Sequence, residues 1–270
     1  MKKSSVLIVC VMAFMLASCS VHKSLVVLTT NDTHSQVLPG DDGTGGYARR
    51  LGIIDTVRAN NKCVVLVDDG DFSQGTIFFN FFKGDVEVLG MNTMKYDAVT
   101  LGNHEFDNGL DSLAKHLSKA KFPIVCANYD VKGTALEGLV KPYVIIKRGG
   151  LKIGIFGLGI SPVNLIADYN FKGITWHNPE ETANAVAEKL KKQAKCDVVI
   201  CISHLGVAES AKFSDWTIAK NSHYIDLICS GHSHLVINKQ VPNADGKPVQ
   251  IIQAGKTGAQ IGRVDMVFRK

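Results

Sequence analysis

The stretch Thr29-Thr30-Asn31-Asp32-Thr33-His34 completes an apolar run and ends it with side chains that bind metals. The run Leu25–Thr30 is apolar and β-branched, which is typical of a buried strand. Carboxylates and imidazoles are common metal ligands in proteins. The stretch therefore predicts a strand whose last residues lead directly into a metal site.

Four later segments repeat this pattern of an apolar strand followed by Asp, Asn or His. They are Val64–Asp69 before Gly70-Asp71, Ala98–Leu101 before Gly102-Asn103-His104-Glu105, Val198–Ile202 before Ser203-His204, and Ile225–Cys229 before Gly231-His232-Ser233-His234. In open α/β sheets the carboxyl ends of the strands line the ligand crevice. We therefore expect the five strand ends to meet at one site.

Two metal ions would account for the side chains at these strand ends. Asp71 follows Gly70, which permits a tight turn, and its carboxylate is the candidate bridge between two ions. Imidazole ligands favour divalent ions of the Mn, Zn, Fe or Co type over Mg or Ca. Two ions about 3.5–4 Å apart would activate water and stabilise an in-line displacement on phosphorus. The candidate ligands are Asp32, His34, Asp71, Asn103, His204, His232 and His234.

His104 and Asp107 are the candidate catalytic residues. A protonated His104 would donate to the leaving oxygen or stabilise the phosphoryl charge, with Asp107 orienting the ring. Each motif alone has a structural explanation, since Gly102-Asn103 is a common turn pair and Asp71 follows a turn-forming sequence. Their joint occurrence favours metal binding. Four other histidines have no partner ligand at suitable spacing and are expected at the surface: His22, His116, His177 and His223.

The order of the expected elements favours an α/β protein. Helices are expected at 47–59, 86–96, 110–120, 179–194 and near 213–221. Strands are expected at 25–30, 63–69, 97–101, 124–127, 141–147, 151–157, 197–202, 225–229, 249–253 and 263–268. Strands and helices alternate early, and the second half is expected to be more antiparallel. Two sheets packed between helices in one domain fit this order.

The N-terminus is expected to direct export. Lys2-Lys3 precede an apolar run at Val6–Leu16, which has the length of a secretory signal and is too short to span a bilayer. Leu16-Ala17-Ser18-Cys19 resembles the lipobox of bacterial lipoproteins; the alternative is ordinary signal cleavage. We expect a signal peptide at 1–18, lipidated Cys19 with a tether through 24, and a domain at 25–270. The expected location is the cell envelope, facing the periplasm.

Charge and cysteine content limit the class of protein. The net charge of +5 is modest and has no basic cluster, so a nucleic-acid polymer is not an expected partner. Five cysteines follow the signal and Cys19 without metal-knuckle spacing. They fall in or beside apolar runs, so core positions are favoured over a disulfide framework, although one bridge stays open. These are Cys63, Cys126, Cys196, Cys201 and Cys229.

The five motifs resemble those of the calcineurin-like metallophosphoesterases, and more narrowly the catalytic domain of the bacterial 5′-nucleotidase and UDP-sugar hydrolase family. The motifs are Thr29–His34, Gly70–Thr76, Gly102–Asp107, Ser203–Gly206 and Gly231–His234. The resemblance implies a four-layered α/β/β/α sandwich with mixed sheets. It also implies one metal held by Asp32, His34, Asp71 and His234, and another held by Asp71, Asn103, His204 and His232. His104 and Asp107 match the family's catalytic residues, and Asn103 and His104 would contact substrate.

The sequence departs from the family pattern at two points. Ser35 stands where the family usually has glycine, and the chain ends at Lys270, where relatives continue into a nucleotide-binding domain. We expect a 5′-nucleotidase-type phosphomonoesterase acting on nucleotides or other small phosphoesters, with a separate protein as a candidate source of the second domain. The alternatives are a 2′,3′-cyclic-nucleotide phosphodiesterase, a UDP-sugar hydrolase, and a non-catalytic lipoprotein that binds a partner.

Overall fold

The computed structural model describes residues 22–269. The expected signal peptide and the lipidation site at Cys19 lie outside these residues. In the part of the chain that is described, no helix combines the length and the apolarity needed to cross a membrane.

The first sheet carries the early strand-end motifs. Its strands β1, β2, β3, β4 and β6 run parallel, and β14 is antiparallel at the edge beside β1. In spatial order they are β14 (Gly262–Arg269), β1 (His22–Thr30), β2 (Val64–Asp68), β3 (Ala98–Val99), β4 (Ile124–Val125) and β6 (Val140–Lys141).

The second sheet carries the later motifs. Its order is β12 (Val236–Pro242), β13 (Pro248–Ala254), β11 (Leu227–Ser230), β10 (Val198–Ser203), β8 (Leu151–Leu158) and β7 (Tyr143–Arg148). The four central strands are parallel, and only the edge strands β12 and β7 pair antiparallel. Every antiparallel pair among the described residues includes a strand of the second half of the chain, so the expectation of a more antiparallel second half is confirmed, although the centre of this sheet is parallel. β5 (Tyr129–Asp130) and β9 (Thr175–Trp176) form a separate antiparallel ribbon.

Five of the six α-helices of the described residues lie close to expected positions, whereas the helix at Ile77–Phe82 was not expected. The six helices are α1 (Tyr47–Asn60), α2 (Ile77–Phe82), α3 (Asp85–Met94), α4 (Gly109–Leu117), α5 (Pro179–Glu188) and α6 (Asp215–Asn221). Short 3-10 turns occur at η1 (His104–Phe106) and η2 (Asp168–Asn170), and α5 continues into a π-helical turn, η3 (Lys189–Gln193). Asn178 begins α5 by accepting hydrogen bonds from the backbone N–H groups of Glu180 and Glu181, an N-cap that stabilises the first turn.

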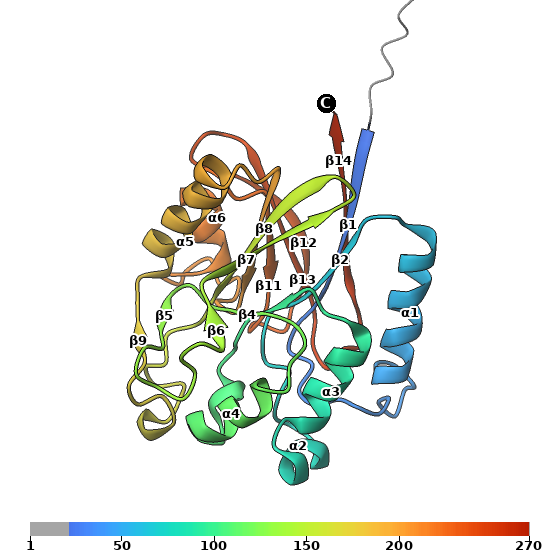
Figure 1. Cartoon of the computed structure of the whole chain (residues 1–270), viewed down its shortest axis with the longest axis vertical. Helices are drawn as coiled ribbons and strands as arrows, with labels where there is room; N and C mark the ends of the chain where they lie inside the picture. Colours follow the sequence, from blue (N-terminus) through green and yellow to red (C-terminus); the bar gives the residue numbers. More distant parts are fainter. Residues whose placement is uncertain (1–21, 270) are drawn as a thin grey trace, which may run out of the picture.

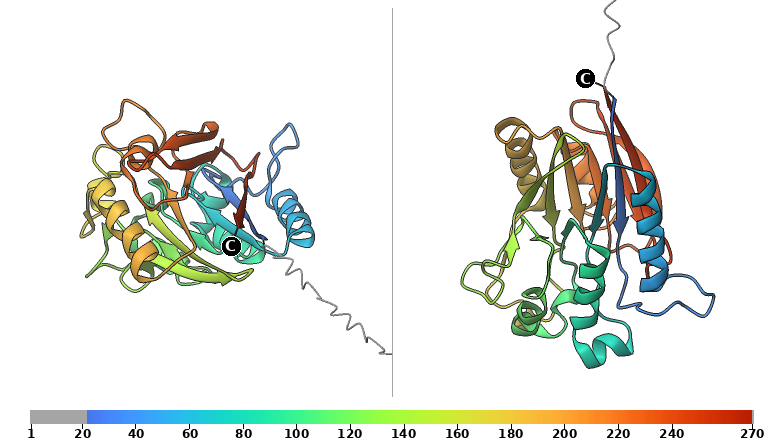
Figure 2. Two further views of the ribbon diagram at one scale, coloured as in Figure 1. Left: turned by 90° about the horizontal axis from the view of Figure 1, so that it is seen from above. Right: turned by 45° about the vertical axis from the view of Figure 1, so that its right-hand side comes forward.

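Alternation of buried side chains along the strands produces the layers. Successive strand residues point to opposite faces, so in β1 Val27 packs between the two sheets while Leu28 packs against α1 and α3. The outer face of the second sheet packs in the same way against Ala183 of α5 and Ile218 of α6. Figures 1 and 2 show the sheets between α1 and α5. The expected four-layered α/β/β/α sandwich with mixed sheets is confirmed.

Three further details differ from expectation. β1 begins at His22, not Leu25, because its pairing with β14 extends to Arg269, so residues 22–24 are strand rather than tether (Figure 1). β12 was not expected, because most of its side chains are exposed and carry no apolar alternation. His116 was expected at the surface, but it is buried with its Nδ1 atom 2.6 Å from Asp85 Oδ1. The five cysteines of the described part are free and buried, as expected.

The two sheets approach closely at Gly157 of β8. A Cβ atom at this position would lie 1.9 Å from the Val125 carbonyl oxygen of β4 and 2.6 Å from Thr100 Oγ1. The Gly157 carbonyl also accepts a hydrogen bond from the backbone N–H of Ala127. Only a residue without a side chain permits this backbone contact between the sheets.

Gly157→Ala is therefore expected to lower the free energy of unfolding by about 2–3 kcal/mol, because the opposing backbone has little freedom to move. Gly52→Ala is the matched control, since Gly52 lies in α1 with open space around it. It should raise the free energy of unfolding by up to about 1 kcal/mol, the usual gain of Ala over Gly in a helix. Urea denaturation followed by circular dichroism measures both values. Equal effects of the two substitutions would contradict the close sheet contact.

Candidate metal centre

The five predicted strand ends converge at one edge of the molecule, beyond the carboxyl ends of β1, β2, β3, β10 and β11. Five of the seven predicted ligands have left-handed backbone conformations, with φ between 45° and 71°: Asp32, His34, Asp71, His232 and His234. Such values are uncommon for residues other than glycine and gather at functional sites, where the surrounding structure maintains them. The left-handed turns direct the side chains back toward a common centre.

The first group of ligand atoms comes from both sheets. Asp32 and His34 follow β1, and His234 follows β11. The Nε2 atoms of His34 and His234 lie 3.1 Å apart, and His234 Nε2 lies 3.3 Å from Asp32 Oδ1. All three residues offer atoms within 4.8 Å of one another, a spacing that suits ligands of one ion.

The second group is Asp71, His204 and His232, whose ligand atoms also lie within 4.8 Å of one another. His204 Nε2 is 3.0 Å from Asp71 Oδ2 and 3.8 Å from Asp32 Oδ1, so the two groups are adjacent. The buried Asn103 lies beside Asp71, since the next backbone N–H, that of His104, donates to Asp71 Oδ1 at 2.9 Å.

The donor set fits divalent transition metals. His204 donates from Nδ1 to the Asp69 carbonyl at 2.7 Å, which leaves the Nε2 lone pair for a metal. The buried Asn103 Oδ1 atom has no hydrogen-bond partner among the described residues, and the buried His204 Nε2 atom faces the Asp71 carboxylate at 3.0 Å without the geometry of a hydrogen bond. Buried polar atoms in proteins are almost always paired, so these unpaired atoms are accounted for by metal ions.

Burial and mutual charge determine the protonation of the ligands. Burial opposes a charge on His204, but the Asp71 carboxylate outweighs it and raises the pKa of His204 to about 10. Burial likewise opposes a charge on Asp71, yet His204 holds the pKa of Asp71 well below its usual range. Burial lowers the pKa of His232 to about 4 and also lowers the pKa of His34. Because metals bind neutral imidazole, an ion at this site would displace the His204 proton.

The predicted catalytic pair lies next to the ligands. His104 Nδ1 is 2.9 Å from Asp107 Oδ2, and this hydrogen bond raises the pKa of His104. The side chains of His104 and Asp107 are 32% and 38% exposed, so substrate has access to them. The His104 ring centroid is 5.4 Å from that of His34. A proton donor and a candidate ligand therefore share one surface.

Two residues that orient the ligands were not predicted. The buried Glu105 carboxylate accepts hydrogen bonds from the backbone N–H groups of Asp71, Ser73 and Gly102 at 2.9, 3.0 and 2.6 Å. Asn31 donates to Asp32 Oδ2 at 2.6 Å. Both residues stand within the quoted motifs, but their orientation depends on loops that are distant in sequence.

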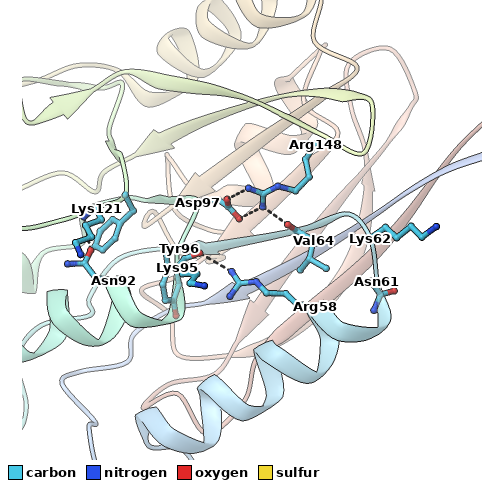
Figure 3. Close-up of a pocket in the computed structure, with 11 residues that line it drawn as sticks. Arg58, Asn61, Lys62, Val64, Asn92, Lys95, Tyr96, Asp97, Lys121 and Arg148 are labelled. Atoms are coloured by element: carbon cyan, nitrogen blue, oxygen red, sulfur yellow. Dashed lines mark hydrogen bonds and ion pairs between the residues drawn. The ribbon is translucent and has the colours of Figure 1, made fainter.

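A cavity of about 610 Å³ lies away from the candidate metal centre, at the opposite ends of the strands. Figure 3 shows its arginines, which are engaged in structural contacts. Arg148 pairs with Asp97 at 2.7 and 2.8 Å and donates to the Val64 carbonyl, and Arg58 donates to the carbonyls of Met94 and Lys95. Because this cavity has none of the candidate ligands, its size does not make it the catalytic site.

Residues 25–236 match the calcineurin-like phosphoesterase family, and the chain belongs to it. Its members are metal-dependent phosphoric ester hydrolases that use two divalent ions. The family resemblance inferred from the motifs is thereby confirmed.

Among curated proteins, the snake venom 5′-nucleotidase of Crotalus adamanteus is 34% identical over 272 residues, covering 90% of this chain and 45% of that protein. The 5′-nucleotidase of Vibrio cholerae is 32% identical over 271 residues, covering 91% and 49%. The chain thus spans about half the length of the curated relatives it matches.

Solved structures agree with the fold. The 5′-nucleotidase precursor from Thermus thermophilus superposes with a TM-score of 0.82 at 30% identity, covering 90% of this chain and 51% of that chain. The calcineurin-like phosphoesterase YfkN from Bacillus subtilis gives 0.76 at 29% identity, covering 92% and 86%.

Glu105→Gln tests the orienting role of Glu105. The substitution turns an amide NH₂ toward backbone N–H donors, so affinity for Mn²⁺ or Zn²⁺ is expected to fall about 10- to 100-fold, the usual effect of losing an outer-sphere partner. Isothermal titration calorimetry measures the affinity. The control is Glu137→Gln, because Glu137 accepts a backbone N–H from Gly133 in a loop between β5 and β6. Unchanged affinity in Glu105→Gln would show that the metal site does not depend on this carboxylate.

Proposed function

We propose that this protein is a metal-dependent phosphomonoesterase that hydrolyses 5′-nucleotides. The observation that carries the proposal is the His104–Asp107 hydrogen bond, 2.9 Å long, beside two adjacent groups of metal-ligand atoms. A scaffold that only binds a partner needs neither a complete ligand set nor an oriented histidine next to it. The names of the relatives support nucleotides as the substrate.

The seven expected ligands divide into two sets in this proposal. Asp32, His34, Asp71 and His234 would hold one ion, and Asp71, Asn103, His204 and His232 would hold the other. The two groups are adjacent, because His204 Nε2 lies 3.0 Å from Asp71 Oδ2 and 3.8 Å from Asp32 Oδ1, and this adjacency supports a shared ligand, which we assign to Asp71. When bound, divalent ions of the Mn, Zn, Fe or Co type supply Lewis-acid activation of the phosphate ester and of water.

His104 acts on the phosphate in this proposal. Its Nδ1 atom is engaged by Asp107, so its Nε2–H is available for substrate. The hydrogen bond to Asp107 raises the pKa of His104, which favours the imidazolium form. That form donates a proton to the leaving oxygen or a hydrogen bond to a phosphoryl oxygen, where negative charge develops. Asn103, the residue before His104, would contact the same phosphate through its amide.

Phosphate release from 5′-AMP in the presence of Mn²⁺ is the primary test. We expect activity that a chelator abolishes, and a loss of about 10²- to 10⁴-fold in kcat for His104→Ala, the usual contribution of a general acid. His223→Ala is the matched control, because His223 pairs with Asp245 at 3.0 Å at the surface. It should retain full activity.

Metal content separates the proposed roles. His232→Ala should lose bound metal together with activity, whereas His104→Ala should lose activity and keep its metal. UDP-glucose, 2′,3′-cyclic AMP and an aryl phosphate, assayed in parallel, define the substrate class. Preference for the aryl phosphate over nucleotides would indicate that nucleotide recognition comes from a separate protein. No turnover with any metal would contradict the proposed enzyme.

We also propose that the protein is exported and anchored to the cell envelope through a lipid on Cys19. The support is the short apolar run Val6–Leu16 followed by Leu16-Ala17-Ser18-Cys19. Ser20 follows Cys19, with no acidic residue at that position, which favours a periplasm-facing site on the outer membrane where the cell has one.

Cys19→Ser is expected to abolish incorporation of labelled palmitate and to move the protein from the detergent phase to the aqueous phase of a Triton X-114 partition, because no acyl chain is attached. Cys63→Ser is the control, since Cys63 is buried in the domain. Labelling of Cys19→Ser at the wild-type level would exclude this anchor.

A further inference from the structure

A second pocket, of about 280 Å³, opens beside the candidate metal centre. Its walls come from the ends of β8 and β10, from β9, and from the loops before α6 and after β11. The principal lining residues are Ile160, Ser161, Trp176, Leu205, Phe213 and His232. Pockets for drug-sized ligands measure about 300–1,000 Å³, so this volume suits one ring system rather than a whole nucleotide.

Two aromatic rings form one side of this pocket. Trp176 and Phe213 meet edge to face, with ring centroids 5.8 Å apart and planes at 65°. Trp176 Nε1 donates to the Gly159 carbonyl at 3.2 Å, which holds the indole in place. Both side chains are only half-buried, and the surface that stays exposed borders the pocket.

The pocket and the metal centre share a wall. His232 belongs to the second ligand group and also lines the pocket, and Leu205 directly follows the ligand His204. A group held in the pocket would therefore touch a candidate metal ligand. The pocket is therefore adjacent to the second ligand group, so one substrate is able to occupy both.

The chemistry of the lining selects a planar apolar group. Most of the lining is apolar; its polar side chains are those of Ser161, Lys212 and His232, and Lys212 Nζ lies over the Phe213 ring, 5.1 Å from its centroid. Among the described residues no carboxylate lines the pocket to bind sugar hydroxyls. Aromatic and apolar walls with few polar atoms favour a π-system that stacks.

We propose that this pocket binds the planar aromatic part of the substrate, a nucleobase or an aryl group, while the phosphate lies at the metal centre. The inference rests on the proposed phosphomonoesterase function and adds a recognition element within this chain. Base stacking on an aromatic side chain typically contributes about five- to hundredfold in affinity. Trp176 and Phe213 would thus determine specificity without acting on the phosphate.

The test compares 5′-AMP with ribose 5-phosphate, which has the same ester and lacks the base. In Trp176→Ala and Phe213→Ala, kcat/KM for 5′-AMP is expected to fall about five- to hundredfold through KM, with kcat/KM for ribose 5-phosphate unchanged. The unchanged activity also shows that each variant is folded. Trp176→Phe, which keeps a ring, should largely restore the preference for 5′-AMP. Phe81→Ala is the control, since Phe81 is 79% exposed on α2 and does not line the pocket.

Equal losses of kcat/KM on both substrates, or no loss on either, would contradict the proposal that this pocket binds the base. Binding of adenosine gives a reading that does not need turnover. In Trp216→Phe, Trp176 is the sole tryptophan, and adenosine should quench its fluorescence unless Phe213→Ala is also present. Quenching without turnover would support the pocket and contradict the proposed function. An absence of quenching would contradict base binding in this pocket, even if the enzyme is active.

Discussion

The contact between Asp71 of the first sheet and His204 of the second sheet, 3.0 Å between Oδ2 and Nε2, is the interaction on which the centre depends. It requires the carboxyl ends of both sheets to meet at one edge. The apolar layer between the sheets and the close backbone approach at Gly157 set that geometry. A shift of one sheet against the other would separate the ligands without breaking any strand. Packing of the core between the sheets therefore determines the geometry of the metal centre.

The loops that carry the ligands are held against their own preferences. Left-handed conformations at residues other than glycine cost roughly 1–2 kcal/mol each, and Asp32, Asp71 and His232 all adopt them. Hydrogen bonds compensate: the Glu105 carboxylate fixes two loops, and the backbone N–H of His232 donates to both oxygens of Asp32. The centre is thus organised by the protein itself, which lowers the reorganisation needed when ions bind.

The two ends of the strands have different uses. At the amino ends, arginines such as Arg148 bind carbonyls and a carboxylate and connect the second sheet to the first. At the carboxyl ends, the polar side chains point at one another and leave ligand atoms unpaired. The aromatic pocket formed by Trp176 and Phe213 opens at this second end as well. The candidate metal centre and the proposed recognition pocket therefore open at the same end of the strands.

The sequence by itself predicted most of the strands, the candidate ligands and the family, because each motif is local: an apolar run packs as a strand, and Asp, Asn or His follows it directly. The strand β12, the buried position of His116, and the roles of Glu105 and Trp176 required the tertiary structure. Their signals are not local, since β12 has exposed side chains and Glu105 acts by accepting N–H groups from other loops. Trp176 and Phe213 are distant in sequence and meet only because the ribbon strand β9 lies against the loop before α6. Local side-chain chemistry predicts what a residue is able to bind, and chain packing decides what it meets.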